Sequence, residues 1–181
     1  MVNDRPGSNT PQPQRTHGID TALLGIYLND HLAGATAGVE RARHLVRSTQ
    51  GSTLAGALGP VAVEIAQDRT SLLAIMKGLD VPVRRYKVYA GWTAEKVARL
   101  KNNGRLVRRS PLSTVLELEL LRMAVEGKAA GWQTLRRLAA AEERLSPELL
   151  DGLLERARRQ QGVVEEWRAR QAEATFGNGT V

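Results

Sequence analysis

Apolar residues recur along this chain at intervals of three and four, the spacing that keeps side chains on one face of an α-helix. The pattern predicts four long helices, over residues 20–48, 53–79, 111–143 and 147–174. The apolar face of the first consists of Leu24, Leu28, Leu32, Ala35, Val39, Ala42 and Val46. Each predicted helix is long enough to span a domain, so we expect the four to pack lengthwise as a bundle.

Residues with capping properties mark where these helices begin. Asp20 is the predicted N-cap of the first helix, because its carboxylate can accept hydrogen bonds from the free N–H groups of the first turn. Ser110 and Ser146 each precede a proline, which combines a capping hydroxyl with a proline at the first helical position. Pro60 either kinks the second helix or marks its true start, since proline lacks the N–H that a helix interior requires.

The lengths of the connections favour one topology. Only a few residues separate the first helix from the second, and the third from the fourth, so each pair should form an antiparallel hairpin. About thirty residues join the two hairpins and include a short predicted helix over 93–101. Such a connection is long enough to run back along the whole length of the bundle, whose helices are roughly 40 Å long. We therefore expect an all-α, ferritin-like four-helix bundle of residues 19–176, with a disordered tail at 1–18 and a frayed tail at 177–181.

Composition narrows the class of protein. Hydrophobic residues make up 42% of the 181, enough for one core, and Leu, Ala and Val favour helices. The chain has no Cys, which excludes disulfides, thiolate zinc sites and cysteine nucleophiles. No apolar run approaches the roughly 18 residues of a membrane span, and the first residues lack the apolar segment of a signal peptide. We therefore expect a cytoplasmic protein without membrane partners.

The positive charge is concentrated in the long connection. Residues 84–109 contain nine basic residues and one acidic residue, a charge of +8, which leaves −1 for the rest of a chain of net charge +7. Cations interleaved with aromatic rings suit single-stranded nucleic acid or another anionic ligand. The candidate anion-binding residues are Arg84, Arg85, Lys87, Tyr89, Arg105, Arg108 and Arg109. Alternatively, the aromatic residues fix the connection to the bundle while the cations remain in water.

Several polar residues fall where the helical pattern requires apolar ones. They are His31, Glu64, Asp68, Glu119, Gln160 and Gln161. Asp68 is the clearest case, because it interrupts a series of apolar residues in the second helix. Carboxylates inside a core must be paired, protonated or bound to a metal, since burial of a bare charge costs several kcal/mol.

Two interpretations of these polar residues stay open. A di-iron site of the ferritin type requires a Glu-x-x-His pair on each of two helices, and this sequence has none. The first interpretation is therefore a reduced site for a single metal ion, with the candidate ligands His31, Glu64, Asp68 and Glu119. The second is a buried hydrogen-bond network, in which His31 or Lys128 pairs with Asp68 or Glu119.

Familiar catalytic motifs are missing from the sequence. It contains no nucleophile with a matching base, no phosphate-cradling glycine loop and no dinucleotide fingerprint. Lys128 and Trp132 are one turn apart in the third predicted helix, so the cation can lie along the indole ring. A catalytic role for Lys128 would need a pocket, which the sequence does not predict.

Three segments resemble an uncharacterised family of actinobacterial helical-bundle proteins with a ferritin-like arrangement. They are YLNDHLAG at 27–34, RLKNNG at 99–104, and RSPLS at 109–113 leading into ELE at 117–119. The resemblance implies the same fold over about residues 19–140, and the family brings no established activity. The histidine ligands of true ferritins have no counterpart here, which weakens the oxidoreductase hypothesis.

Three functional hypotheses follow from the sequence. The first is a non-catalytic interaction or assembly module. Such a protein would form a homo-oligomer or bind a partner protein, and it would not need a cofactor. The second is a reduced metal-binding or oxidoreductase bundle that holds one metal ion. The third is a protein that binds nucleic acid or another anionic ligand through residues 84–109.

Overall fold

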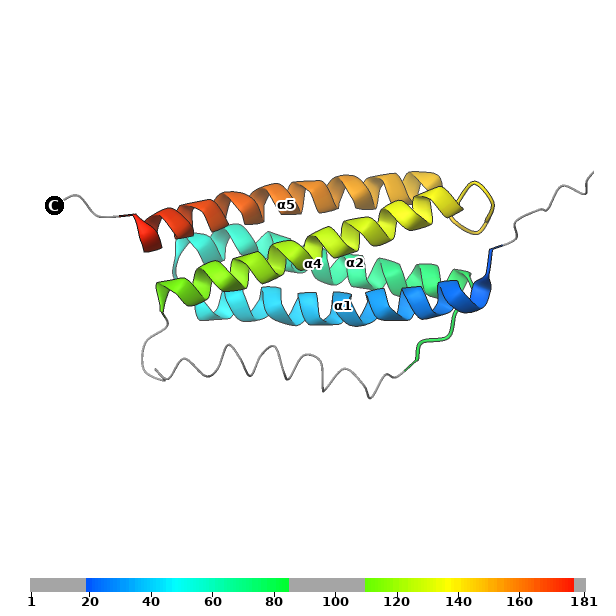
Figure 1. The fold of residues 1–181 in the computed structure, drawn as a ribbon, viewed down its shortest axis with the longest axis horizontal. Helices are drawn as coiled ribbons and strands as arrows, with labels where there is room; N and C mark the ends of the chain where they lie inside the picture. The colour runs from blue at the N-terminus through cyan, green and yellow to red at the C-terminus, as the bar shows by residue number, and fades with distance from the viewer. Residues whose placement is uncertain (1–18, 85–109, 178–181) are drawn as a thin grey trace, which may run out of the picture.

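A computed structural model describes residues 19–84 and 110–177 of the chain. Within these ranges the regular elements are four helices, without a strand. They are α1 (Thr21–Ser48), α2 (Thr53–Gly78), α4 (Pro111–Leu138) and α5 (Pro147–Phe176) (Figure 1). The prediction of an all-α bundle is confirmed for this part of the chain. The expected short helix at 93–101 and the tails at 1–18 and 178–181 lie outside the described residues.

Side-chain caps fix three of the four helix starts. The Asp20 carboxylate accepts two backbone N–H hydrogen bonds at the start of α1, each at 3.0 Å. The hydroxyls of Ser52 and Ser146 accept one each at the starts of α2 and α5. The predicted hydroxyl cap at Ser110 is wrong, because its side chain makes no cap hydrogen bond. Pro111 begins α4 instead, and its missing N–H needs no acceptor.

One further helix boundary agrees with its predicted position and one does not. Pro60 lies inside α2, which begins at Thr53, so Pro60 does not mark the helix start. α4 ends at Leu138 rather than at 143. The residues that follow Leu138 turn, and Leu145 thereby reaches the core, where it is 4% exposed. Packing of this side chain outweighs the helix propensity of the alanines before it.

All four helices contribute to one apolar core. Its largest apolar side chains with less than 2% exposure are Leu28, Leu45, Leu58, Met76, Leu118, Leu121, Val125, Leu135, Leu150, Leu153 and Val164. Burial of such a side chain stabilises the fold by about 1.5–3 kcal/mol relative to leaving it in water. The helix faces predicted from the apolar pattern are therefore the faces that pack together.

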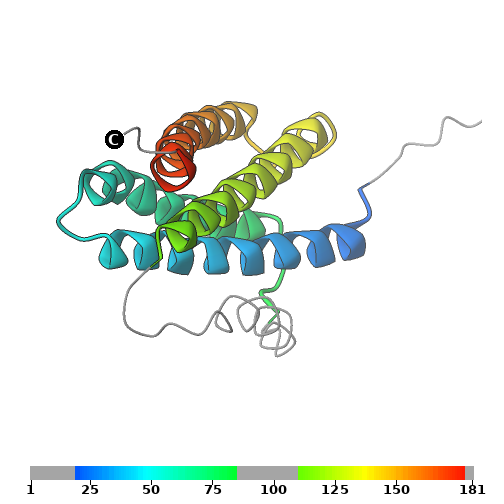
Figure 2. The ribbon, with the colours of Figure 1, turned by 60° about the vertical axis from the view of Figure 1, so that its left-hand side comes forward.

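The helices do not contact one another equally. α1 packs along α2 and along α4, and α5 packs along α4, whereas α2 and α5 meet over a short stretch (Figure 2). Tyr27 near the start of α1 donates a hydrogen bond to the Thr134 hydroxyl near the end of α4, at 3.0 Å. His44 near the end of α1 lies 3.7 Å from Glu117 near the start of α4. Among the helices described, none is long and apolar enough to cross a membrane.

A buried amide holds the segment after α2 against α1. Asn29 is 3% exposed, and its Nδ2 donates to the carbonyl oxygens of Gly25 at 2.7 Å and Pro82 at 3.1 Å. Its Oδ1 accepts the backbone N–H of Arg84 at 2.7 Å. The sequence pattern did not single out Asn29, yet it fixes the direction in which the chain leaves α2.

Candidate functional site

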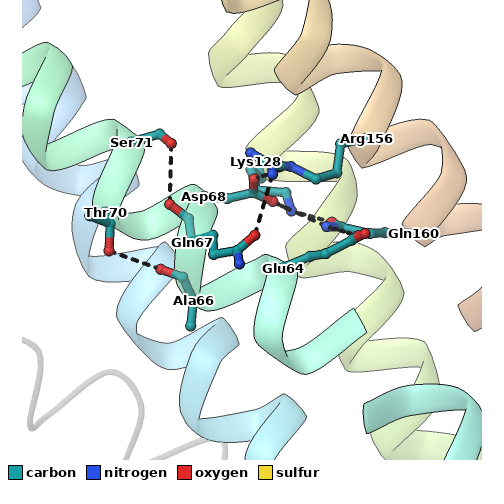
Figure 3. Close-up of polar contacts among 9 residues, drawn as sticks. All are labelled: Glu64, Ala66, Gln67, Asp68, Thr70, Ser71, Lys128, Arg156 and Gln160. Atoms are coloured by element: carbon teal, nitrogen blue, oxygen red, sulfur yellow. Dashed lines mark hydrogen bonds and ion pairs between the residues drawn. The ribbon is translucent and has the colours of Figure 1, made fainter. Parts of the chain in front are cut away.

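A polar cluster crosses the core where α2, α4 and α5 meet. Its members are Glu64 and Asp68 of α2, Lys128 of α4, and Arg156 and Gln160 of α5 (Figure 3). The members from α2 are four residues apart, as are those from α5, so each pair lies on one helix face. Asp68 and Gln160 are each only 1% exposed. The cluster thus connects α2 and α5 where these helices otherwise have little contact.

Asp68 is held by two cations. Lys128 Nζ donates a hydrogen bond to Asp68 Oδ2 at 2.5 Å, and Arg156 Nε lies 2.8 Å from Asp68 Oδ1. The second contact is an ion pair without a hydrogen bond, because the Nε–H does not point at the oxygen. Neither of those two atoms has a hydrogen-bond partner elsewhere in residues 19–84 or 110–177.

Gln160 joins the cations to both carboxylates. Its Oε1 accepts a short hydrogen bond from Lys128 Nζ. Its Nε2 donates to Glu64 Oε2 at 2.9 Å and to Asp68 Oδ2 at 3.2 Å. A neutral amide suits this position because it both accepts and donates, which neither a carboxylate nor an ammonium group can do when charged.

The charges of the cluster balance. It contains two carboxylates and two cations, so no net charge is buried. Burial lowers the pKa of Lys128, and the neighbouring Asp68 carboxylate opposes this by raising it. A buried pair of this kind costs much to break, because removal of one partner leaves the other charged and desolvated.

The four candidate metal ligands do not converge. Glu64 and Asp68 meet through Gln160, and the Lys128 ammonium group donates to Asp68 Oδ2. Glu119 is directed elsewhere, 3.9 Å from Arg168, with its side chain 45% exposed. No group of three or more His, Cys, Asp or Glu side chains suited to a metal occurs among the residues that the structure describes.

His31 lies on α1, away from the polar cluster. Its ring centroid is 4.3 Å from that of Tyr27, and its other neighbour is Gly131 of α4. A Cβ atom at position 131 would lie 2.8 Å from His31 Nδ1, so the close approach of the ring requires glycine there. Burial lowers the pKa of His31, while Asp30 raises it. The imidazole therefore packs as a neutral ring.

Sequence reasoning found some members of the cluster and missed others. Gln160 faces inward as predicted, whereas Gln161 bonds to Glu126 at the surface. Arg156 was not predicted, although it lies one turn before Gln160 on the same face. The predicted stacking of Lys128 on Trp132 is wrong, because Lys128 extends to Asp68 instead. The buried Trp132 Nε1 has no hydrogen-bond partner within the described ranges.

A groove of about 690 Å³ separates parts of α1 and α4. Its apolar walls include Leu28, Leu72, Leu120, Met123, Trp132 and Leu135. Small residues widen it, with Gly34 and Gly38 on α1 and Gly127 and Gly131 on α4. Asp68 and Lys128 also line it, so the groove reaches the polar cluster. Its volume lies within the roughly 300–1,000 Å³ of typical small-molecule sites.

Arg41 lies at one end of this groove, three residues beyond Gly38. Its side chain is partly buried, and no hydrogen bond or ion pair joins it to any of the described residues. Glu117 of the facing helix contacts His44 instead. Asp30 lines the groove eleven residues earlier on α1, about 16 Å away at 1.5 Å per residue. The groove therefore has at one end a cation that no described residue pairs with.

Most of the candidate anion-binding residues cannot be placed. Arg84 is exposed, and its backbone N–H bonds to Asn29. The others lie outside the described residues, namely Arg85, Lys87, Tyr89, Arg105, Arg108 and Arg109.

Comparison with known proteins gives no relative: no family model, curated protein or solved structure matches this chain.

Proposed function

We propose that this protein is a non-catalytic binding module and that the groove between α1 and α4 is its binding surface. The observation that carries the proposal is the groove itself, which combines a ligand-sized volume with walls that are mostly apolar. A packed core normally fills such space, since interiors approach the density of organic crystals. Gly34 and Gly127 keep this space open, since no described atom lies within 4 Å of the position that a Cβ would take at either residue.

The polar groups that reach the groove support binding more than catalysis. Lys128 lines a pocket, as a catalytic lysine would, but its ammonium group already donates to Asp68 and Gln160. Asp68 in turn is engaged by Lys128 and Arg156. A general base or nucleophile needs an atom that is available to a substrate. Here these atoms instead stabilise the wall of the groove.

We further propose that the architecture is two antiparallel hairpins joined by one long crossover, the ferritin-like arrangement. The contacts of Tyr27 with Thr134 and of His44 with Glu117 support opposite directions for α1 and α4. α2 then runs in the same direction as α4, and a connection between them must return along the bundle.

An uncharged apolar dye, N-phenyl-1-naphthylamine, tests the binding proposal. We expect saturable fluorescence enhancement at one site per chain. Gly34→Leu should abolish it, because Gly34 lines the groove and no described atom lies within 4 Å of the position its Cβ would take. Gly56→Leu is the matched control, since Gly56 is exposed on α2, equally unobstructed and outside the groove. Equal dye binding by both variants would refute the proposal.

The other hypotheses from the sequence stay predictions. Metal analysis of protein purified without chelator tests for a single bound metal. Sedimentation tests self-association. Retention on heparin before and after Arg84→Ala/Arg85→Ala tests nucleic-acid binding. The resemblance to actinobacterial bundle proteins and the cytoplasmic location likewise remain expectations.

A further inference from the structure

We infer that the groove binds an amphiphilic carboxylate, an elongated apolar molecule with one terminal anionic group, whose carboxylate pairs with Arg41. This inference rests on the proposed function, because it names the class of ligand that the same groove would take. Three observations carry it: the shape and apolar lining of the groove, the neutrality of its interior, and the cation at one end that pairs with none of the described residues.

The shape of the groove suits an elongated ligand. Its lining residues on α1 extend from Tyr27 to Arg41, which is about 21 Å at 1.5 Å per residue. Between those ends the lining residues from the two helices are mostly aliphatic, aromatic or glycine. An apolar chain laid along this path would remove its own surface and that of the walls from water, at about 25 cal/mol per Å².

The interior of the groove offers no unmatched charge to a ligand. Lys128 and Asp68 line it but neutralise each other, and burial lowers the pKa of His31, which favours the neutral ring. An ionic group in the middle of the ligand would therefore lose its hydration without gaining a partner. The charged group of the ligand belongs at an end.

Arg41 determines at which end of the groove the charged group of the ligand lies and that this group is an anion. It is a partly buried guanidinium group without an ion pair to any described residue, and it lines the groove. Guanidinium binds carboxylate through two parallel hydrogen bonds, which are stronger than those between neutral groups. This pairing orients the carboxylate toward Arg41 and leaves the apolar chain to extend along the groove toward Trp132.

Three probes with the same twelve-carbon chain test this inference: dodecanoate, dodecanol and dodecylammonium, each below its micelle concentration. They are titrated against the bound dye. We expect dodecanoate to bind at least about tenfold more tightly than the other two, because only its carboxylate can form charge-assisted hydrogen bonds with a guanidinium group. Arg41→Gln should remove this preference and leave dodecanol affinity unchanged. Arg43→Gln is the control, since Arg43 is exposed and does not line the groove.

The outcomes separate the two proposals. Equal affinity of the unaltered protein for dodecanoate and dodecylammonium would overturn the carboxylate inference, and so would an unchanged preference for dodecanoate in Arg41→Gln. In either case, dye binding and its loss in Gly34→Leu would still support a binding groove. Absence of dye binding would refute the proposed function and the inference together. Helicity and melting temperature establish that Arg41→Gln and Arg43→Gln remain folded.

Discussion

The contact between α2 and α5 differs in kind from the contact between α1 and α4. Between α2 and α5, where the helices meet over a short stretch, charged and amide side chains reach across and satisfy one another. Between α1 and α4 the helices pack over a longer stretch, but small residues leave a groove open between them. In the first region, polar side chains that pair with one another fill the space between the helices. In the second region, glycines, which lack side chains, leave space between the helices. The difference places a buried polar network on one side of the bundle and, on the other, the groove for which we propose a binding role.

The largest expected effect comes from removing the central carboxylate. Asp68→Ala leaves Lys128 and Arg156 buried without their shared partner, and we expect the free energy of unfolding to fall by about 3–5 kcal/mol. Urea denaturation measures this. Asp151→Ala is the control. The side chains of Asp151 and its ion-pair partner Arg136 are both exposed, so this pair should contribute less than about 1 kcal/mol. Equal losses in the two variants would show that the cluster is not central to stability.

Replacing both members of the buried pair of Lys128 and Asp68 should cost less stability than breaking the pair. In Asp68→Leu/Lys128→Met the remaining charges, Glu64 and Arg156, still balance, and apolar groups fill the vacated volume. Buried pairs replaced in this way are often neutral in stability. We expect a double-mutant cycle to give a coupling of at least about 3 kcal/mol, because each single replacement leaves a buried charge unpaired and the double replacement does not. A coupling near zero would mean that the two residues act independently.

The close approach of α1 and α4 at His31 gives an intermediate effect. Gly131→Ala places a Cβ 2.8 Å from His31 Nδ1, so the ring must move, at a cost of about 1–3 kcal/mol. Gly127→Ala, one turn earlier, meets no described atom within 4 Å and should stabilise the helix by up to about 1 kcal/mol. In a His31→Ala background the penalty at position 131 should disappear. Persistence of the penalty in that background would contradict this account.

The smallest expected effect is a dependence on pH. Burial lowers the pKa of His31 below its ordinary value of 6.5, so the unfolded chain takes up this proton first as the pH falls. Stability should therefore decrease below pH 6.5 and level off below the pKa of the folded state. Asp30 opposes the shift and limits the effect. His31→Gln should lose this component of the slope when melting temperatures are compared from pH 7.5 to 5, and an unchanged slope would argue against it.

Much of the fold follows from the sequence because helical periodicity depends on short-range spacing. The starts of α1 and α5 and the inward position of Gln160 were predictable from caps and apolar faces. The end of α4 was not, since it depends on where Leu145 packs.

The candidate site was less predictable than the fold. Asp68 stood out as a polar residue on an apolar face, but its partners depend on three helices meeting. Arg156 resembles the solvent-facing arginines around it until the distance to Asp68 is known. The groove could not be predicted because a glycine-rich face is compatible with close packing as well as with open space. Only the relative positions of α1 and α4 distinguish the two.

The most direct test of the binding groove uses the indole N–H signals of the tryptophans. Trp132 lines the groove, whereas Trp167 lies on α5 outside it, 5.0 Å beneath the guanidinium group of Arg170. In a ¹H–¹⁵N spectrum of the protein titrated with N-phenyl-1-naphthylamine, we expect the Trp132 indole signal to shift saturably and the Trp167 signal to stay in place. A shift of Trp167 with Trp132 unchanged would place the bound molecule elsewhere and contradict the account.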